Sequence, residues 1–145
     1  FTDEAGLARL QEEDRVIEIR AYDTVYGVWK YFTVWEEQMN LERESYCLIG
    51  TLEAWNAMCQ YFGREKMIPV YIEVEDGTRL IRAVERERTQ EHPGYEELCR
   101  RFLADAKDFS EENLKNAGIT RRFENKDMNA CLEEIKLFIQ KAILI

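Results

Sequence analysis

The chain has 145 residues with a formal net charge of -9, and 46% of its residues are hydrophobic. That length and apolar content favour one folded domain of ordinary size over a disordered chain. The acidic charge argues against a nucleic-acid polymer as a partner, because such a partner requires a basic surface that displaces counterions. A small phosphate ligand remains compatible with it, since that ligand needs only a local cluster of arginines. No run is long and apolar enough to span a bilayer, so we expect no membrane partner.

Cysteine and histidine usage predicts a cytoplasmic protein without a metal site in this chain. The four cysteines form no CxxC pair, which favours free thiols in a reducing compartment. They lie at Cys47, Cys59, Cys99 and Cys131. The sequence also lacks a signal-peptide pattern at its start. His92 falls in a predicted loop, where a lone histidine is more often solvated than a metal ligand.

Residues 1–34 predict a small antiparallel β unit behind a short helix. Thr2 or Asp3 can cap a helix that runs through Gln11. Residues 15–22 alternate polar and apolar side chains with period two, which is typical of a strand with one wet face. Residues 25–34 are rich in aromatic and β-branched side chains and predict one or two further strands.

Residues 35–145 predict an α/β core. The continuous apolar run at 46–50 suits a strand buried on both faces of a parallel sheet, and Thr51 can cap the helix that follows. Residues 68–74 and 120–124 read as two further strands. Asp127 can cap a last helix with an apolar inner face at Met128, Cys131, Leu132, Ile135, Phe138 and Ile139.

A helical excursion at about 77–117 separates the second and third core strands. It consists of two helices with a break at His92-Pro93-Gly94, followed by a short helix that Ser110 can cap. Its two long helices carry arginines at Arg79, Arg82, Arg86, Arg88, Arg100 and Arg101. The spacing i, i+3, i+7 puts the first three on one helical face, where guanidinium groups can bind phosphate oxygens. The alternative is a solvated surface on which these arginines pair with neighbouring glutamates.

The alternation of strands and helices predicts right-handed crossovers and a parallel sheet. In such folds ligands bind at the carboxyl ends of the strands. Those ends are Gly50-Thr51, Val74-Glu75-Asp76 and Glu124-Asn125.

The front unit resembles the nucleoside-monophosphate-binding region of guanylate kinases. The similarity lies in Val16-Ile17-Glu18, followed by Tyr26-Gly27. It implies that Glu18 reads the guanine edge and that Tyr26 contacts the substrate phosphate. One carboxylate can accept both the N1–H and the exocyclic amine of guanine, which supports the first role. From the residues alone, Glu18 could equally be a strand carboxylate paired with Arg20 or Arg15, and Tyr26 could simply pack in the sheet.

Two later segments resemble the same family. Arg82-x-x-x-Arg86 followed by Arg100-Arg101 is similar to its lid arginines. Phe123-Glu124-Asn125-x-Asp127 is similar to its closing strand, whose Asn lies near the adenine. The resemblance implies catalytic roles for Arg82, Arg86 and Arg101, and nucleotide-binding roles for Arg100 and Asn125.

The resemblance implies an α/β fold with a parallel-sheet core similar to P-loop kinases, a small antiparallel β nucleotide-binding unit and a helical lid. The implied reaction moves the γ-phosphoryl group of ATP to GMP with Mg²⁺ bound to the ATP.

Three departures from the family pattern qualify that expectation. The sequence contains no GxxxxGKS or GxxxxGKT motif, so we expect this chain alone to be inactive. It would need an upstream segment or a homodimer partner, and its start at Phe1 suggests a piece of a longer chain. Gly50-Thr51 replaces the usual Asp of the substrate site, which leaves Thr51 as the substrate-binding residue there, and Val28 replaces a usual hydroxyl residue. These departures leave two alternatives to a kinase. The chain could be a non-catalytic module that binds a nucleotide or a protein, or it could be an acidic structural domain.

Overall fold

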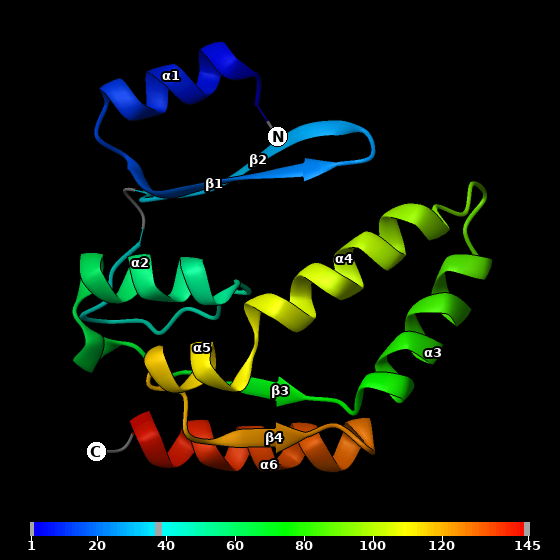
Figure 1. Ribbon diagram of the computed structural model, residues 1–145. Helices are drawn as coiled ribbons and strands as arrows, with labels where there is room; N and C mark the ends of the chain where they lie inside the picture. Colours follow the sequence, from blue (N-terminus) through cyan, green and yellow to red (C-terminus); the bar gives the residue numbers. More distant parts are fainter. Residues whose placement is uncertain (1, 37–38, 144–145) are drawn as a thin grey trace. The chain divides into compact units, whose positions relative to one another are not determined.

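The structure is a computed structural model that describes residues 2–36 and 39–143. It is a mixed α/β chain whose described residues form six α-helices, one antiparallel strand pair and one parallel strand pair (Figure 1). The chain divides into two compact units between Arg64 and Glu65. The division falls later than the expected boundary after Val34, because helix α2 (Leu52–Phe62) packs on the first strand and belongs to the first unit.

The first unit is built around a β-hairpin of β1 (Val16–Thr24) and β2 (Gly27–Val34). Helix α1 (Glu4–Glu12) precedes the hairpin, and a Lys30–Glu4 ion pair of 2.6 Å joins the helix to β2. The hairpin pairs antiparallel with one irregularity between Val16 and Glu18. The predicted helix and both predicted strands of this region are therefore confirmed.

Helix ends in the first unit follow local sequence signals. The Asp3 side chain accepts a hydrogen bond from the backbone N–H of Gly6 and caps α1. Thr51 caps α2 through the N–H of Ala54. Gly63 ends α2 with a φ of 91°, a backbone conformation that glycine adopts without steric cost.

The prediction of a strand at 46–50 is wrong. This segment is irregular backbone, and its Ile49 side chain is fully exposed. A parallel strand exists only where a neighbouring strand satisfies its N–H and C=O groups. The described residues provide no such neighbour for the segment. The apolar run therefore has the composition of a buried strand, but no described strand forms backbone hydrogen bonds with it.

The second unit alternates short strands with helices. Its elements are β3 (Tyr71–Glu73), α3 (Asp76–Arg88), α4 (Tyr95–Asp108), α5 (Glu111–Asn116), β4 (Arg122–Glu124) and α6 (Met128–Ile143). Strands β3 and β4 pair in parallel, as predicted, but each is only three residues long. Among the described residues this sheet has two strands, so both its outer edges lack a strand partner.

Helix α6 lies along the β3–β4 pair and forms a core with it (Figure 1). The centre of this core is Phe123, which is fully buried and packs with Cys131 and Ile135. The prediction for the inner face of α6 holds at these positions, but Met128 and Leu132 are 70% and 46% exposed. A sheet of two short strands covers only a narrow part of the helix, which accounts for their exposure.

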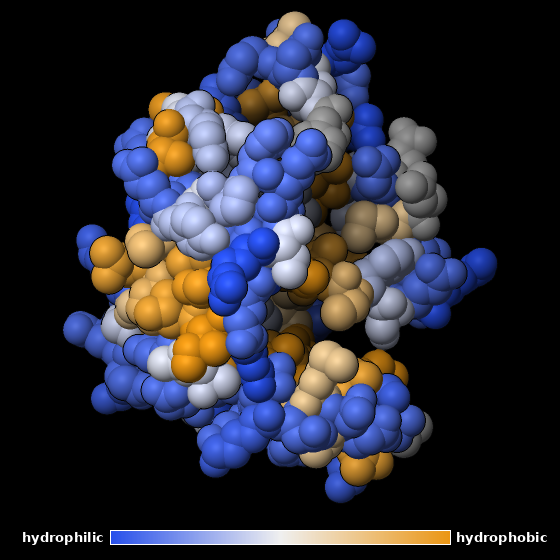
Figure 2. Space-filling view, turned by 90° about the vertical axis from the view of Figure 1, so that its right-hand side faces the viewer, coloured by the Kyte–Doolittle hydropathy of each residue, from blue (hydrophilic) through white to orange (hydrophobic). Residues whose placement is uncertain are grey.

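Helices α3 and α4 form a helical hairpin that begins directly after β3 (Figure 1). The break between them is confirmed, and the Glu87 side chain closes it by accepting a hydrogen bond from the N–H of Gly94 at 2.6 Å. Leu103 of α4 is 70% exposed, and Figure 2 shows other hydrophobic residues reaching the surface in patches between hydrophilic ones. None of the described helices has the length and apolar character required to cross a membrane.

Candidate functional site

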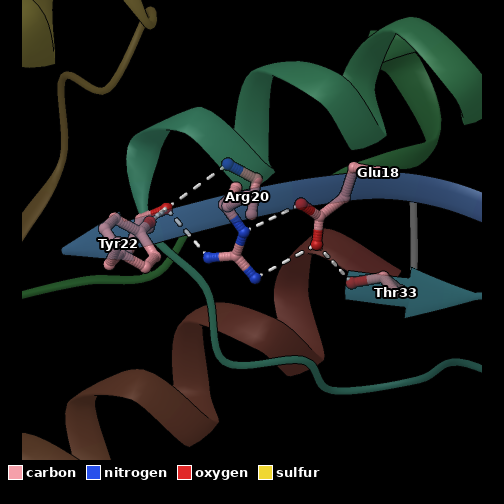
Figure 3. Close-up of polar contacts among 6 residues, drawn as sticks. Glu18, Arg20, Tyr22 and Thr33 are labelled. Atoms are coloured by element: carbon pink, nitrogen blue, oxygen red, sulfur yellow. Dashed lines mark hydrogen bonds and ion pairs between the residues drawn. The ribbon is translucent and has the colours of Figure 1, made fainter. Parts of the chain in front are cut away.

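Glu18 is the only charged residue among the described ones that is buried, and its side chain is 3% exposed. Both of its carboxylate oxygens are engaged (Figure 3). Arg20 donates from Nε at 2.8 Å to one oxygen and from Nη2 at 3.1 Å to the other. Thr33 adds a hydroxyl donor at 2.6 Å. Of the two arginines that the sequence left open as partners of Glu18, the structure therefore selects Arg20.

The Glu18–Arg20 pair is possible because strand geometry places the two side chains together. Residues two apart on a strand share a face, and the register sets Thr33 of β2 directly opposite Glu18. A buried carboxylate is tolerated only when charge pairing and hydrogen bonds replace its lost hydration. Burial lowers the pKa of Arg20, but the hydrogen bond and the negative charge of Glu18 together raise it above its ordinary value. Arg20 is thus held in its charged form.

Thr51 connects this pair to helix α2. Its hydroxyl accepts a hydrogen bond from Nη1 of Arg20 at 3.1 Å and lies 3.5 Å from the Tyr22 hydroxyl. The same oxygen caps α2 through the N–H of Ala54 at 3.4 Å. Two predicted substrate-binding residues, Glu18 and Thr51, are therefore brought together through Arg20. Sequence reasoning did not assign Arg20, Tyr22 or Thr33 to a site, although the period-two pattern placed the first two on the face of Glu18.

Tyr26 lies apart from this network, in the turn between β1 and β2. Its side chain is 68% exposed, and that of its neighbour Val28 is 62% exposed. The Thr24 hydroxyl stabilises the turn by donating to the Gly27 carbonyl at 2.8 Å and accepting from the Tyr26 N–H at 3.1 Å. Tyr26 therefore does not pack in the sheet, which removes the alternative role considered from the sequence.

In the second unit, Arg82 reaches from α3 to the carboxyl end of β4. Its Nη1 donates to the Asn125 carbonyl at 3.1 Å and its Nη2 to the Lys126 carbonyl at 3.3 Å. The backbone N–H of Asn125 donates to the Glu73 carbonyl at 2.8 Å, which continues the ladder at the end of β3. Two predicted site residues, Arg82 and Asn125, thus meet where both parallel strands end.

Asn125 carries an unused acceptor at this place. Its Oδ1 is buried and has no hydrogen-bond partner among the described residues. Buried polar atoms are rarely left without a partner, so this atom is an unusual feature of the strand end.

The remaining arginines of the helical hairpin differ in their surroundings. Arg79 is packed inside it, 4.3 Å above the Phe102 ring, and Arg100 forms a two-point ion pair with Glu97 at 2.7 and 2.8 Å. Arg86 and Arg101 are exposed, and the structure gives neither side chain an ion pair within the described part of the chain. Two of the three predicted catalytic arginines therefore remain available to an anionic ligand.

Asp105 of α4 lies within reach of Arg79 of α3. Desolvation raises the pKa of its carboxyl group, although Arg79, with a nitrogen 3.9 Å away, acts in the opposite direction. The Nε of Arg79 is itself buried and lacks a partner among the described residues. This arginine therefore has a packing role between α3 and α4.

The described residues do not form a cluster of three or more His, Cys, Asp or Glu side chains that could hold a metal ion. The Mg²⁺ that the resemblance implies would accompany ATP, and it stays a prediction. We assign none of the described residues to a metal.

The predicted site residues fall into both compact units. Glu18, Tyr26 and Thr51 belong to the first unit, and the arginines and Asn125 belong to the second. No known family profile, curated protein or solved structure matches the chain.

Proposed function

We propose that this chain is the substrate-binding and lid part of a guanylate-kinase-like nucleoside monophosphate kinase. The reaction would be phosphoryl transfer from ATP to GMP, with Mg²⁺ accompanying ATP. The phosphate-binding loop is missing from these 145 residues and would have to be supplied from outside them. The first unit would bind the nucleoside monophosphate, and the helical hairpin of the second would supply the lid arginines.

One observation carries this proposal: the helical hairpin leaves the carboxyl end of β3, and Arg82 fastens it to the carboxyl end of β4. Ligands of α/β proteins bind at this end of a parallel sheet. Arg86 lies one turn further along α3 and is exposed. The arrangement therefore supports guanidinium groups next to a phosphate-binding edge.

The two arginines would have different tasks. Arg82 already donates two hydrogen bonds to backbone carbonyls, so it would position the hairpin over the strand ends. Arg86 would stabilise the negative charge that spreads over the transferring phosphoryl group. Asn125, at the carboxyl end of β4, would lie near the adenine, as in the family that the chain resembles. Closure of the hairpin would exclude water from the transfer.

The test is a coupled assay of the full-length protein with ATP, Mg²⁺ and each nucleoside monophosphate. We expect Arg86→Ala to lower kcat with GMP by roughly 100-fold and to change the Kd for GMP by less than about threefold. Arg82→Ala should lower turnover as well, since the hairpin loses its attachment. Arg88→Ala is the matched control, because Arg88 is exposed on the same helix but off the face of Arg82 and Arg86. Equal turnover in Arg86→Ala, Arg82→Ala and the parent protein would reject the proposal.

The second candidate is a guanylate-kinase-like module that binds a protein instead of catalysing transfer. Exposed apolar side chains at the hairpin turn favour it, since Tyr26 and Val28 are 68% and 62% exposed. The two candidates separate in one measurement, because a full-length protein that lacks both phosphoryl transfer and GMP binding would favour the module.

A further inference from the structure

The helical hairpin of α3 and α4 is attached to the rest of the second unit mainly at its two ends (Figure 1). Among the described elements, α3 packs chiefly on α4, and none of the residues of α3 is buried. Helix α4 has one buried residue, Leu98. Arg82 adds hydrogen bonds of 3.1 and 3.3 Å to two backbone carbonyls. The position of the helical hairpin therefore depends largely on what holds its ends.

Arg122 of β4 holds the end from which the helical hairpin starts. Its Nη1 donates to Oε1 of Glu73 at 2.8 Å. The parallel register sets Arg122 beside Tyr71, and Glu73 follows two residues later on the same face of β3. Glu73 is the last residue of β3, and α3 begins at Asp76. The guanidinium is therefore bonded to the strand end that leads into the helical hairpin.

The same guanidinium holds the end at which the helical hairpin returns to the sheet. Helix α5 follows α4 and begins at Glu111, whose two carboxylate oxygens accept from Nη1 and Nη2 of Arg122. The Asn113 side chain donates to the carbonyls of Lys107 and Asp108 at 3.2 and 3.1 Å, which fastens α5 to the last turn of α4. A guanidinium suits this double contact because its donors form a rigid fork.

These bonds are partly exposed to solvent, unlike the core on the other face of the sheet. The side chains of Arg122, Glu73 and Glu111 are 31%, 39% and 78% exposed. The hydrogen bonds that Arg122 donates lower the pKa of Glu111, so this carboxylate stays ionised to lower pH than an ordinary glutamate. Salt weakens ion pairs that solvent can reach. The contacts of Arg122 can therefore open without exposing the core around Phe123.

We propose that Arg122 is a clasp that couples the two ends of the helical hairpin, so that both ends are released in one event. The reason is that Glu73 and Glu111 share Nη1, and rotation of the guanidinium breaks both contacts together. The inference rests on the proposed function only in its consequence. If the helical hairpin is the lid of a kinase, Arg122 is a positioning residue for Arg86 and Arg101.

Hydrogen exchange measured by mass spectrometry on the 145-residue chain tests the coupling without any ligand. Glu111→Ala removes the contact at the return end and leaves Glu73 in place. We expect it to speed amide exchange by roughly 5- to 30-fold at residues 107–116 and also at residues 71–79. Arg122→Gln should speed both segments at least as much, and α6 should exchange as in the parent. Raising NaCl from about 0.05 to about 1 M should speed both segments in the parent but not in Arg122→Gln.

Glu112→Ala is the matched control. Glu112 is exposed in the same helical turn and carries the same charge, but Arg122 donates to Glu73 and Glu111 instead. This variant should exchange as the parent does at residues 71–79. If the full-length protein transfers phosphoryl groups, Glu111→Ala should also lower kcat and leave the Kd for GMP within about threefold, whereas Glu112→Ala should change neither.

Three results would overturn the inference and leave the proposed function standing. The first is faster exchange in Glu111→Ala at residues 107–116 alone, because the starting end would then be held independently of α5. The second is faster exchange that extends to α6, which would make Arg122 a support of the whole core. The third is unchanged exchange in both variants. Failure of the full-length protein to transfer phosphate would instead reject the proposed function, and the coupling would still be decided by exchange.

Discussion

The buried ion pair makes a quantitative prediction about the stability of the first unit. Glu18→Met leaves the Arg20 guanidinium unpaired, although the Arg20 side chain is only 12% exposed. Arg20→Met leaves a carboxylate that is 3% exposed with the Thr33 hydroxyl as its remaining donor. Removing one partner of a buried pair costs about 3–5 kcal/mol of unfolding free energy, because the other charge stays buried without compensation.

The double variant Glu18→Met/Arg20→Met separates the pair from its surroundings. Replacing both charges with apolar side chains of similar volume removes the desolvation cost together with the attraction. We expect the double variant to lie within about 2 kcal/mol of the parent, so that the coupling energy of the cycle is about 3 kcal/mol or more. The Val34→Ile variant on β2 serves as a control for mutation in the hairpin itself.

Urea denaturation followed by tryptophan fluorescence is the suitable assay. All three tryptophans of the chain, Trp29, Trp35 and Trp55, belong to the first unit, so the signal reports this unit alone. Additive effects of the two single substitutions would refute the reasoning, because they would mean that the charges do not depend on each other. Single variants as stable as the parent would refute it equally.

Three further predictions concern individual side chains. Thr51→Ala removes the cap of α2 and an acceptor of Arg20, and should cost about 1–2 kcal/mol in the same urea assay, whereas Thr51→Ser should be near the parent. Glu75 caps α3 by accepting from two backbone N–H groups at 2.8 Å, which lower its pKa. The stabilisation by this carboxylate is therefore full above its unfolded pKa and lost as pH falls through its lower folded pKa. Glu75→Ala should lower the melting temperature at pH 7 but match the parent in acid. The control Glu85→Ala should leave the melting temperature unchanged at either pH. Desolvation raises the pKa of Asp105, so its charge opposes folding above that pKa, and Asp105→Asn should melt at or above the parent temperature at pH 7; a clear decrease would show that the contact with Arg79 dominates.

Local signals in the sequence predicted most helix boundaries of this chain. Ser110 and Asp127 cap their helices through the N–H groups of Asn113 and Ala130, as their spacing indicated. A cap involves residues three positions apart, so the sequence contains all the information required. The prediction of a strand at 46–50 was wrong for the opposite reason. A parallel strand depends on a neighbour distant in sequence, and composition alone does not say whether that neighbour is present.

The candidate site was predictable in part for the same reason. The sequence placed Glu18 and Arg20 on one face of a strand, but it could not rank Arg20 against Arg15 as a partner. The irregularity between Val16 and Glu18 changes the strand locally, and Arg15 turns to Glu13 and Glu36 instead. The meeting of Arg82 with Asn125 joins positions 43 apart in sequence. Only the parallel pairing of β3 and β4 brings the two together.

Stability alone does not explain why Glu18 and Arg20 are charged. Three hydrogen bonds satisfy the carboxylate, yet a pair of apolar residues would fill the same space at similar or lower free energy. A charge pair has another consequence, which is to hold Nη1 of Arg20 in one orientation toward the Thr51 hydroxyl. The double methionine variant distinguishes these roles: if it unfolds at the urea concentration of the parent but binds GMP and AMP equally, the pair serves recognition. If it still prefers GMP, the pair is only a structural element of the hairpin, and recognition must lie elsewhere.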